Sequence, residues 1–310
     1  MKRLSALLLC LVLLVASLAA AGETLRIGAL KGPTAMGLVK LIKDFEGRED
    51  YVVTLAASPD ALLPALVRGE LDAACLPANL AAILYNNTGG AVRAVSINTL
   101  GVLYIVERGS SVTSLPNLSG RTLYASGKAS TPEYALNHLL LQAGVTGVQI
   151  QWKAEHTEAL TALLADPEGL AMLPQPFVAV AQERSPDIRV ALDLNKEWEA
   201  LGEGSLITGV TVARKELIDQ RPELLEKFLL DYQASVEFVN ANNLQAAALI
   251  EEYGIINARA AELALPFCGI TFITGQDMAD LLKPFYQALY GQNPAATGGM
   301  LPDEGFYYSH

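Results

Sequence analysis

Short β-strand patterns alternate with amphipathic helix patterns along this chain, and that alternation constrains the fold more than any other feature. A first strand is expected at 24–29, followed by a helix at 35–46 whose apolar residues recur with helical spacing. Further strands are expected at 51–56 and 71–76. Such alternation is typical of α/β domains built on mostly parallel sheets. A chain of 310 residues is long enough for two of them.

The alternation begins again after residue 107, which predicts a second lobe. Two long strand patterns, at 101–107 and 206–214, bracket this second series. Since an inserted lobe needs two crossings of the chain, we expect these strands to form a two-stranded hinge. Beyond residue 214 every element is expected to be helical. The predicted architecture is α/β with two doubly wound lobes, lobe one from 23–104 plus 209–310 and lobe two, inserted, from 105–208, with a ligand cleft between them.

The N-terminal segment has the pattern of a secretory signal peptide at residues 1–21. A basic start is followed by an apolar run, and Ala19 and Ala21 fit the small-residue rule for cleavage after residue 21. The alternative is an uncleaved membrane anchor, but the run is short for a span. Cys10 is read as part of the apolar run, because Leu9 before it is not the small residue that a lipoprotein signal needs. The sequence predicts export to the periplasm or an equivalent extracytoplasmic space.

Charge and cysteine content narrow the function further. The chain has 22 Lys and Arg against 33 Asp and Glu, a formal net charge of −11. Such an acidic chain is a poor match for nucleic acid, so no nucleic-acid partner is expected. An exported protein can oxidise a cysteine pair, but Cys75 and Cys268 each lie in an apolar setting, and two separately buried thiols are the favoured interpretation.

The loops that follow strands and start helices are expected to face the cleft. They carry lysines, hydroxyls, amides and flexible glycines, and the loops considered contain no carboxylate. Helix N-termini add free N–H donors, so the cleft would suit a small anion or a neutral polar molecule. The competing interpretation is ordinary helix capping with solvated lysines. The candidate ligand-binding residues are Lys31, Gly32, Pro33, Thr34, Met36, Ser58, Pro77, Asn79, Asn98, Ser126, Gly127, Lys128, Ser130, Thr131 and Gln175.

Several catalytic motifs are incomplete. Gly127-Lys128 lacks the glycine and the hydroxyl residue that a phosphate-binding loop requires at fixed spacing. The histidines share no metal-ligand spacing, and no metal or other cofactor is expected. Ser126 has no evident His or Asp partner in the sequence, so a hydrolase triad is not supported. These patterns favour a binding protein over an enzyme.

Five segments, in this order, resemble periplasmic solute-binding proteins of ABC importers in the nitrate/sulfonate/bicarbonate and thiamine-precursor class. They are 69–74 (GELDAA), 118–124 (LSGRTLY), 127–135 (GKASTPEYA), 173–177 (LPQPF) and 299–308 (GMLPDEGFYY). Gln175 stands where glutamate is common in that family, which removes a negative charge near the cleft.

The resemblance implies a type II periplasmic-binding-protein fold that closes on a small-molecule ligand and delivers it to a membrane permease. It implies a receptor without catalysis, and we expect this chain to be a monomer that needs no cofactor. One alternative is an enzyme on the same fold, a pyrimidine synthase of the thiamine pathway, which uses clustered cysteines and a lysine-bound cofactor. Another is a ligand sensor that docks on a signalling receptor.

Overall fold

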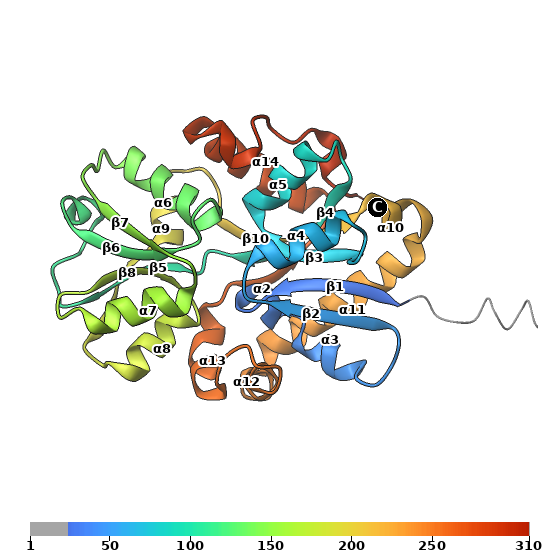
Figure 1. Cartoon of the computed structure of the whole chain (residues 1–310), viewed down its shortest axis with the longest axis horizontal. Coiled ribbons are helices and arrows are strands. Elements are labelled where there is room, and N and C mark those ends of the chain that lie inside the picture. The colour runs from blue at the N-terminus through green and yellow to red at the C-terminus, as the bar shows by residue number, and fades with distance from the viewer. Residues whose placement is uncertain (1–23, 310) are drawn as a thin grey trace, which may run out of the picture.

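The computed structural model describes residues 24–309, in which two β-sheets each carry helices on both faces (Figure 1). The predicted signal peptide and Cys10 lie outside the described residues. The first sheet is six-stranded, in the order β11-β4-β10-β3-β1-β2. Its strands are β1 (Leu25–Leu30), β2 (Tyr51–Ala56), β3 (Ala73–Pro77), β4 (Val92–Leu100), β10 (Ile207–Arg214) and β11 (Ile270–Ile273).

The second sheet is five-stranded, in the order β7-β6-β8-β5-β9. Its strands are β5 (Leu103–Arg108), β6 (Thr122–Ser126), β7 (Gln149–Lys153), β8 (Leu170–Pro174) and β9 (Ile188–Asp193). All of them lie between two strands of the first sheet in the chain, so the second lobe is inserted into the first. Strands β5 and β10, which follow the two crossings, run antiparallel to their neighbours.

The two crossings lie side by side. The first crossing is the pair Gly101-Val102, both with positive φ, and the Gly101 N–H donates to the carbonyl oxygen of Leu206 on the second crossing at 2.7 Å. Residues 103–104 pair in the second sheet, and Ile207 pairs in the first. The strands therefore change from one sheet to the other at these two crossings.

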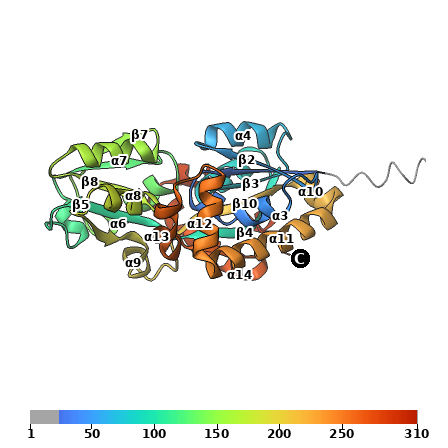
Figure 2. The same cartoon turned by 90° about the horizontal axis from the view of Figure 1, so that it is seen from below.

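Helices cover both faces of each sheet (Figures 1 and 2). Around the first sheet, buried side chains of α4, α5 and α14 pack on one face, and those of α3, α11 and α12 on the other. Around the second sheet, α6 and α9 pack on one face, and α7 and α8 on the other. The helices are α2 (Pro33–Met36), α3 (Val39–Asp44), α4 (Pro59–Val67), α5 (Ala78–Asn87), α6 (Thr131–Gln142), α7 (His156–Ala165), α8 (Phe177–Arg184), α9 (Leu194–Glu199), α10 (Lys215–Gln220), α11 (Pro222–Ala241), α12 (Asn243–Glu252), α13 (Ala258–Ala264) and α14 (Gly275–Gln292).

Beyond residue 214 the all-helical expectation is wrong at one element. Strand β11 pairs antiparallel with β4 at the edge of the first sheet, through Ile270 and Ile273. It has only four residues, ITFI, and it lies between helices in the chain, so no alternating pattern is long enough to reveal it.

The two lobes also touch through helices. Helix α14 of the first lobe packs against α6 of the second, and α13 packs against α8. At the first of these contacts the Trp198 ring lies between His138 and Phe285, with ring centroids 4.9 and 5.7 Å away. The apolar core that starts in the first lobe therefore continues into the second.

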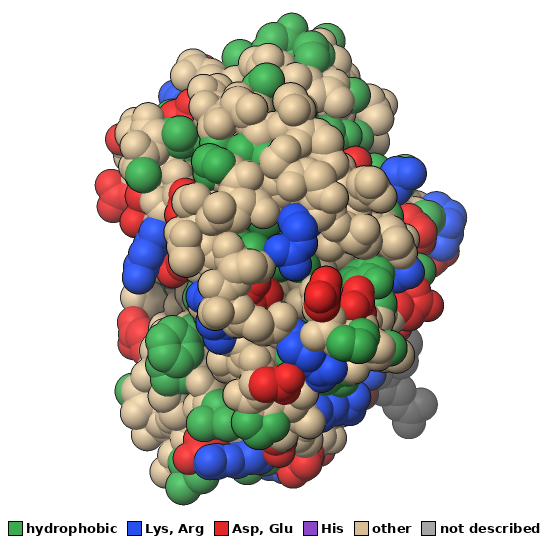
Figure 3. Space-filling model, turned by 90° about the vertical axis from the view of Figure 1, so that its left-hand side faces the viewer, with side chains coloured by type: hydrophobic (Ala, Val, Ile, Leu, Met, Phe, Trp, Pro, Cys, Tyr) green, Lys and Arg blue, Asp and Glu red, His purple; other side chains and the backbone are tan. Residues whose placement is uncertain are grey.

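The surface is mixed in charge where it is shown. On the end of the second lobe that faces the viewer in Figure 3, acidic and basic side chains stand next to one another and to apolar ones. Within residues 24–309, none of the helices combines the length and the hydrophobicity needed to cross a bilayer.

Candidate functional site

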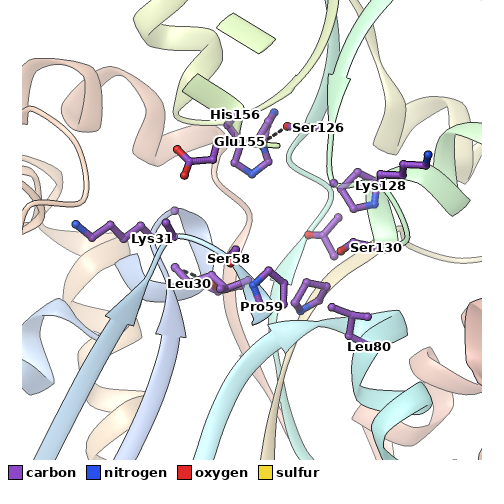
Figure 4. A pocket seen from close by; sticks show the side chains of 18 of the residues that line it. Leu30, Lys31, Ser58, Pro59, Leu80, Ser126, Lys128, Ser130, Glu155 and His156 are labelled. Atoms are coloured by element: carbon purple, nitrogen blue, oxygen red, sulfur yellow. Dashed lines mark hydrogen bonds between the residues drawn. The ribbon is translucent and has the colours of Figure 1, made fainter. Parts of the chain in front are cut away.

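A cleft of about 560 Å³ lies between the lobes, at the point where the parallel strands of both sheets end. The first lobe contributes residues at the ends of β1, β2 and β3, and the second contributes residues at the ends of β6, β7 and β8 (Figure 4). Carboxyl ends of parallel strands at a topological switch are the usual ligand site of open α/β sheets. The volume falls in the range of small-molecule sites.

The first-lobe wall is built by the loop between β1 and α2. Gly32, with φ 138°, lets the chain turn there, and a Cβ at this position would meet no other atom. Thr34 donates from its hydroxyl to the Leu30 carbonyl at 3.0 Å, which fixes the loop. Ser58 and Pro59, at the start of α4, continue this wall.

The second-lobe wall is the loop from Ser126 to Pro132. Gly127 has φ 86°, and a Cβ there would lie 2.8 Å from Pro132 Cγ, so only glycine fits. Ala129 also has a positive φ of 58°. The turn brings Ser130 and the N-terminus of α6 to the edge of the cleft.

Most of the residues expected at the cleft do line it. These are Lys31, Gly32, Pro33, Thr34, Ser58, Pro77, Ser126, Gly127, Lys128 and Ser130. Whether they contact a ligand stays a prediction.

The other expected residues lie outside the lining, each for a structural reason. Met36 is fully buried, with its sulfur 3.9 Å from that of Cys268. Asn98 of β4 is buried and donates to the hydroxyl of Thr211 on the neighbouring strand β10 at 3.0 Å. Gln175 accepts the Ala179 N–H at the start of α8.

Asn79 and Thr131 also lie outside the lining, because they bond to each other across the lobes. The Thr131 hydroxyl donates to Asn79 Oδ1 at 3.0 Å and accepts the Asn79 N–H at 3.2 Å. Asn79 Nδ2 also donates to the Ala129 carbonyl at 3.4 Å. Thr131 thus satisfies a backbone donor in the first turn of α5, where Pro77 provides no side-chain cap. This pair links the lobes beside the cleft.

The structure adds charged and titratable residues that sequence reasoning missed. Lys153 ends β7, Glu155 and His156 follow it, and Asp60 lies in the first turn of α4. The loops considered from the sequence contain no carboxylate, but the cleft lining includes Asp60 and Glu155. The signal was present: residues 148–153 have a strand pattern in the sequence, and the loop after this strand meets the same rule as the loops that were considered.

His156 is the partner that Ser126 lacked in the sequence. Its Nδ1 lies 2.5 Å from the Ser126 hydroxyl, and its ring centroid is 5.1 Å from that of Phe177 (Figure 4). Burial lowers the pKa of His156 to about 4, which keeps the ring neutral near pH 7. The described residues provide no acidic partner to this imidazole, so the pair lacks the third group of a triad.

The lysines of the cleft make no ion pair within the described part of the chain. Lys31 and Lys128 are exposed, and in Figure 4 both side chains extend outward from the cavity. The Lys153 ammonium lies 5.5 Å from the centre of the Tyr124 ring, a cation–π contact.

The cysteines take no part in the cleft. Cys75 and Cys268 are separate, buried, free thiols, as the apolar sequence settings favoured. Burial raises the pKa of Cys75 to about 11, so its reactive thiolate is suppressed. Among residues 24–309, no group of His, Cys, Asp and Glu side chains is arranged to hold a metal ion.

Solved structures with a similar architecture include an ABC transporter protein and sulphonate-binding proteins. An ABC transporter protein from Parabacteroides distasonis has a TM-score of 0.78 at 23% identity, covering 93% of this chain and 99% of its own. The periplasmic aliphatic sulphonate-binding protein SsuA of Escherichia coli has a TM-score of 0.70 at 17% identity, covering 93% and 94%. The alkanesulfonate-binding protein SsuA of Xanthomonas axonopodis pv. citri, bound to MOPS, has a TM-score of 0.69 at 16% identity, covering 91% and 95%.

No protein-family model matches the sequence, and no curated protein matches it. The structural likeness nevertheless shows the fold. The chain has the two-lobed α/β fold of periplasmic binding proteins, which confirms the fold class predicted from the strand and helix pattern.

Proposed function

We propose that this chain is the solute-binding receptor of an ABC importer. It captures a small polar or anionic molecule between its lobes and delivers it to a permease in the membrane. The observation that carries the proposal is the cleft itself, lined by the ends of parallel strands from two lobes that are joined by adjacent crossings. One similar structure is named as the ligand-binding component of an ABC-type import system, and two others are named as sulphonate-binding proteins.

The proposed mechanism is closure of the lobes about the two crossings. The crossings are short and hydrogen-bonded to each other, so they provide one axis rather than two independent tethers. Closure would bring the first-lobe loop at Lys31–Thr34 toward the second-lobe loop at 126–130, with the ligand between them. The lobe assignment, the ligand contacts of the lining residues, a monomeric state and an extracytoplasmic location are parts of this proposal.

The test is a thermal-shift panel on residues 22–310. The panel contains nitrate, bicarbonate, alkyl sulfonates, hydroxymethyl and formylamino pyrimidines, riboflavin and neutral amino acids. A solute at about 100 times its dissociation constant adds about 2.7 kcal/mol of stability. At least one solute is expected to raise the melting temperature.

Matched variants locate the binding. Ala57 lines the cleft and is exposed, so Ala57→Trp fills space there without disturbing a core. Ser110 is exposed and outside the lining, and Ser110→Trp is the control. The shift is expected to disappear in Ala57→Trp and persist in Ser110→Trp. Equal shifts in both variants, or no shift for a protein that native mass spectrometry shows to be empty, would contradict the proposal.

A further inference from the structure

The size and lining of the cleft restrict what it can hold. Its volume of about 560 Å³ compares with about 30 Å³ for one water molecule in the liquid, so a small inorganic anion leaves most of it unfilled. Leucine, valine and proline side chains from both lobes form much of the wall. They are Leu30, Leu63, Leu80, Val102, Leu103, Pro33, Pro59, Pro77, Pro132 and Pro174. An organic body of at least one ring fits these walls.

The charged side chains of the lining are not arranged to hold an anion. None of the described lining residues is an arginine, the side chain best shaped to hold a sulfonate or carboxylate through paired N–H donors. Lys31 and Lys128 extend outward in Figure 4, and the Lys153 ammonium rests near the Tyr124 ring. The carboxylates of Asp60 and Glu155 also belong to the lining and oppose a negative ligand.

The neutral pair Ser126–His156 supplies the directional contact. Ser126 Oγ engages His156 Nδ1, and the Nε2 side of the ring faces the cavity (Figure 4). When the serine hydroxyl donates to Nδ1, Nε2 carries a proton and donates to the ligand. When Nδ1 donates to the serine, Nε2 accepts from the ligand. In both states the pair forms a hydrogen bond without requiring a charge on the ligand.

We propose that the ligand is an uncharged organic molecule with an apolar body, and that His156 forms a hydrogen bond to its polar group through Nε2. This inference rests on the proposed function. His156 is then the residue that determines specificity. Ser126 fixes the orientation of its ring. The site would discriminate against sulfonates and nitrate, which would distinguish this chain from the sulphonate-binding proteins that share its fold.

The experiment compares probes that have nearly the same shape and differ in charge. Benzamide with benzoate, and benzenesulfonamide with benzenesulfonate, are titrated to about 10 mM while the ¹⁵N resonances of the His156 ring are followed by NMR. The neutral member of each pair is expected to bind at least about tenfold more tightly than the anionic member. It is also expected to shift the Nε2 resonance more than the Nδ1 resonance. Its affinity is expected to change by less than about twofold between 0.05 and 0.5 M NaCl, because no ion pair is formed.

Two variants test whether the preference for neutral probes comes from a hydrogen bond to the His156 ring nitrogen or from packing against the ring. His156→Phe keeps an aromatic ring beside Phe177 and removes both nitrogens, so the tenfold preference is expected to vanish. His156→Asn keeps a hydrogen-bonding group and is expected to retain part of it. Tighter binding of the anionic members would overturn this inference while leaving a solute receptor in place. Failure of both neutral probes to move the His156 resonances at 10 mM would also overturn it.

Discussion

The hydrogen bonds between Thr131 and Asn79 should contribute measurably to the stability of the whole chain. Both residues are fully buried, and the single Thr131 hydroxyl serves two groups of Asn79. Thr131→Val keeps the shape and removes the hydroxyl, which leaves a buried N–H and a buried amide oxygen without this partner. An unsatisfied buried group costs about 1–3 kcal/mol, so the variant should lose about 3 kcal/mol of unfolding free energy.

Thr131→Ser is the matched control. It keeps the hydroxyl and removes one buried methyl group, which costs about 1 kcal/mol. Urea denaturation of both variants, with the wild type, measures the difference. The expected gap between valine and serine is about 2 kcal/mol. A double-mutant cycle with Asn79→Ala should give a coupling energy of about 1 kcal/mol or more. Equal losses in the two Thr131 variants, or zero coupling to Asn79, would refute this account of the link between the lobes.

Two further predictions concern the pH dependence of stability and the backbone at Gly269, just before β11. Because the folded-state pKa of His156 is about 4, below the ordinary value of 6.5, the unfolded chain takes up the proton first and stability falls as pH drops through this window. At pH 5 the loss is at most about 2 kcal/mol, and denaturation at pH 7 and pH 5 should show a smaller loss in His156→Phe; an equal loss would contradict the assignment. At Gly269, φ is 54° and a Cβ would lie 1.9 Å from a backbone carbonyl oxygen, so Gly269→Ala should cost more than about 3 kcal/mol. Gly291 in helix α14 has open space around it, so Gly291→Ala should be neutral or stabilising by up to about 1 kcal/mol, and similar effects of the two substitutions would argue against the clash.

The lobes and the cleft were predictable because their signals are local. Strand β1, for example, buries Leu25, Ile27 and Ala29 on one face and packs Gly28 against leucines on the other, so its residues are apolar except for Arg26. The loops that follow such strands must meet at one edge of each sheet. Reading them in order therefore gave a set of candidates, most of which line the cleft.

What was missed depends on contacts between distant residues. Asn79 and Thr131 both stood at the start of predicted helices, where a side chain facing a ligand looks the same as one facing the other lobe. Their mutual hydrogen bonds became visible only when the lobes were placed together. Asn98 was expected in the cleft, but it is buried within the first sheet and its amide donates to Thr211 of the neighbouring strand β10. His156 was passed over because its serine partner is 30 residues away in the chain.

The most direct test of the central claim measures the distance between the lobes. Cys75 and Cys268 are buried and free, so spin labels should attach only to introduced cysteines at the exposed positions Val67 on α4 and Thr161 on α7. Double electron–electron resonance is recorded with and without the solute that gives the largest thermal shift. Closure predicts a shorter and narrower distance distribution with the solute, and the same distribution as the empty protein in Ala57→Trp. A distance that stays the same at saturating solute would contradict a receptor that closes on its ligand.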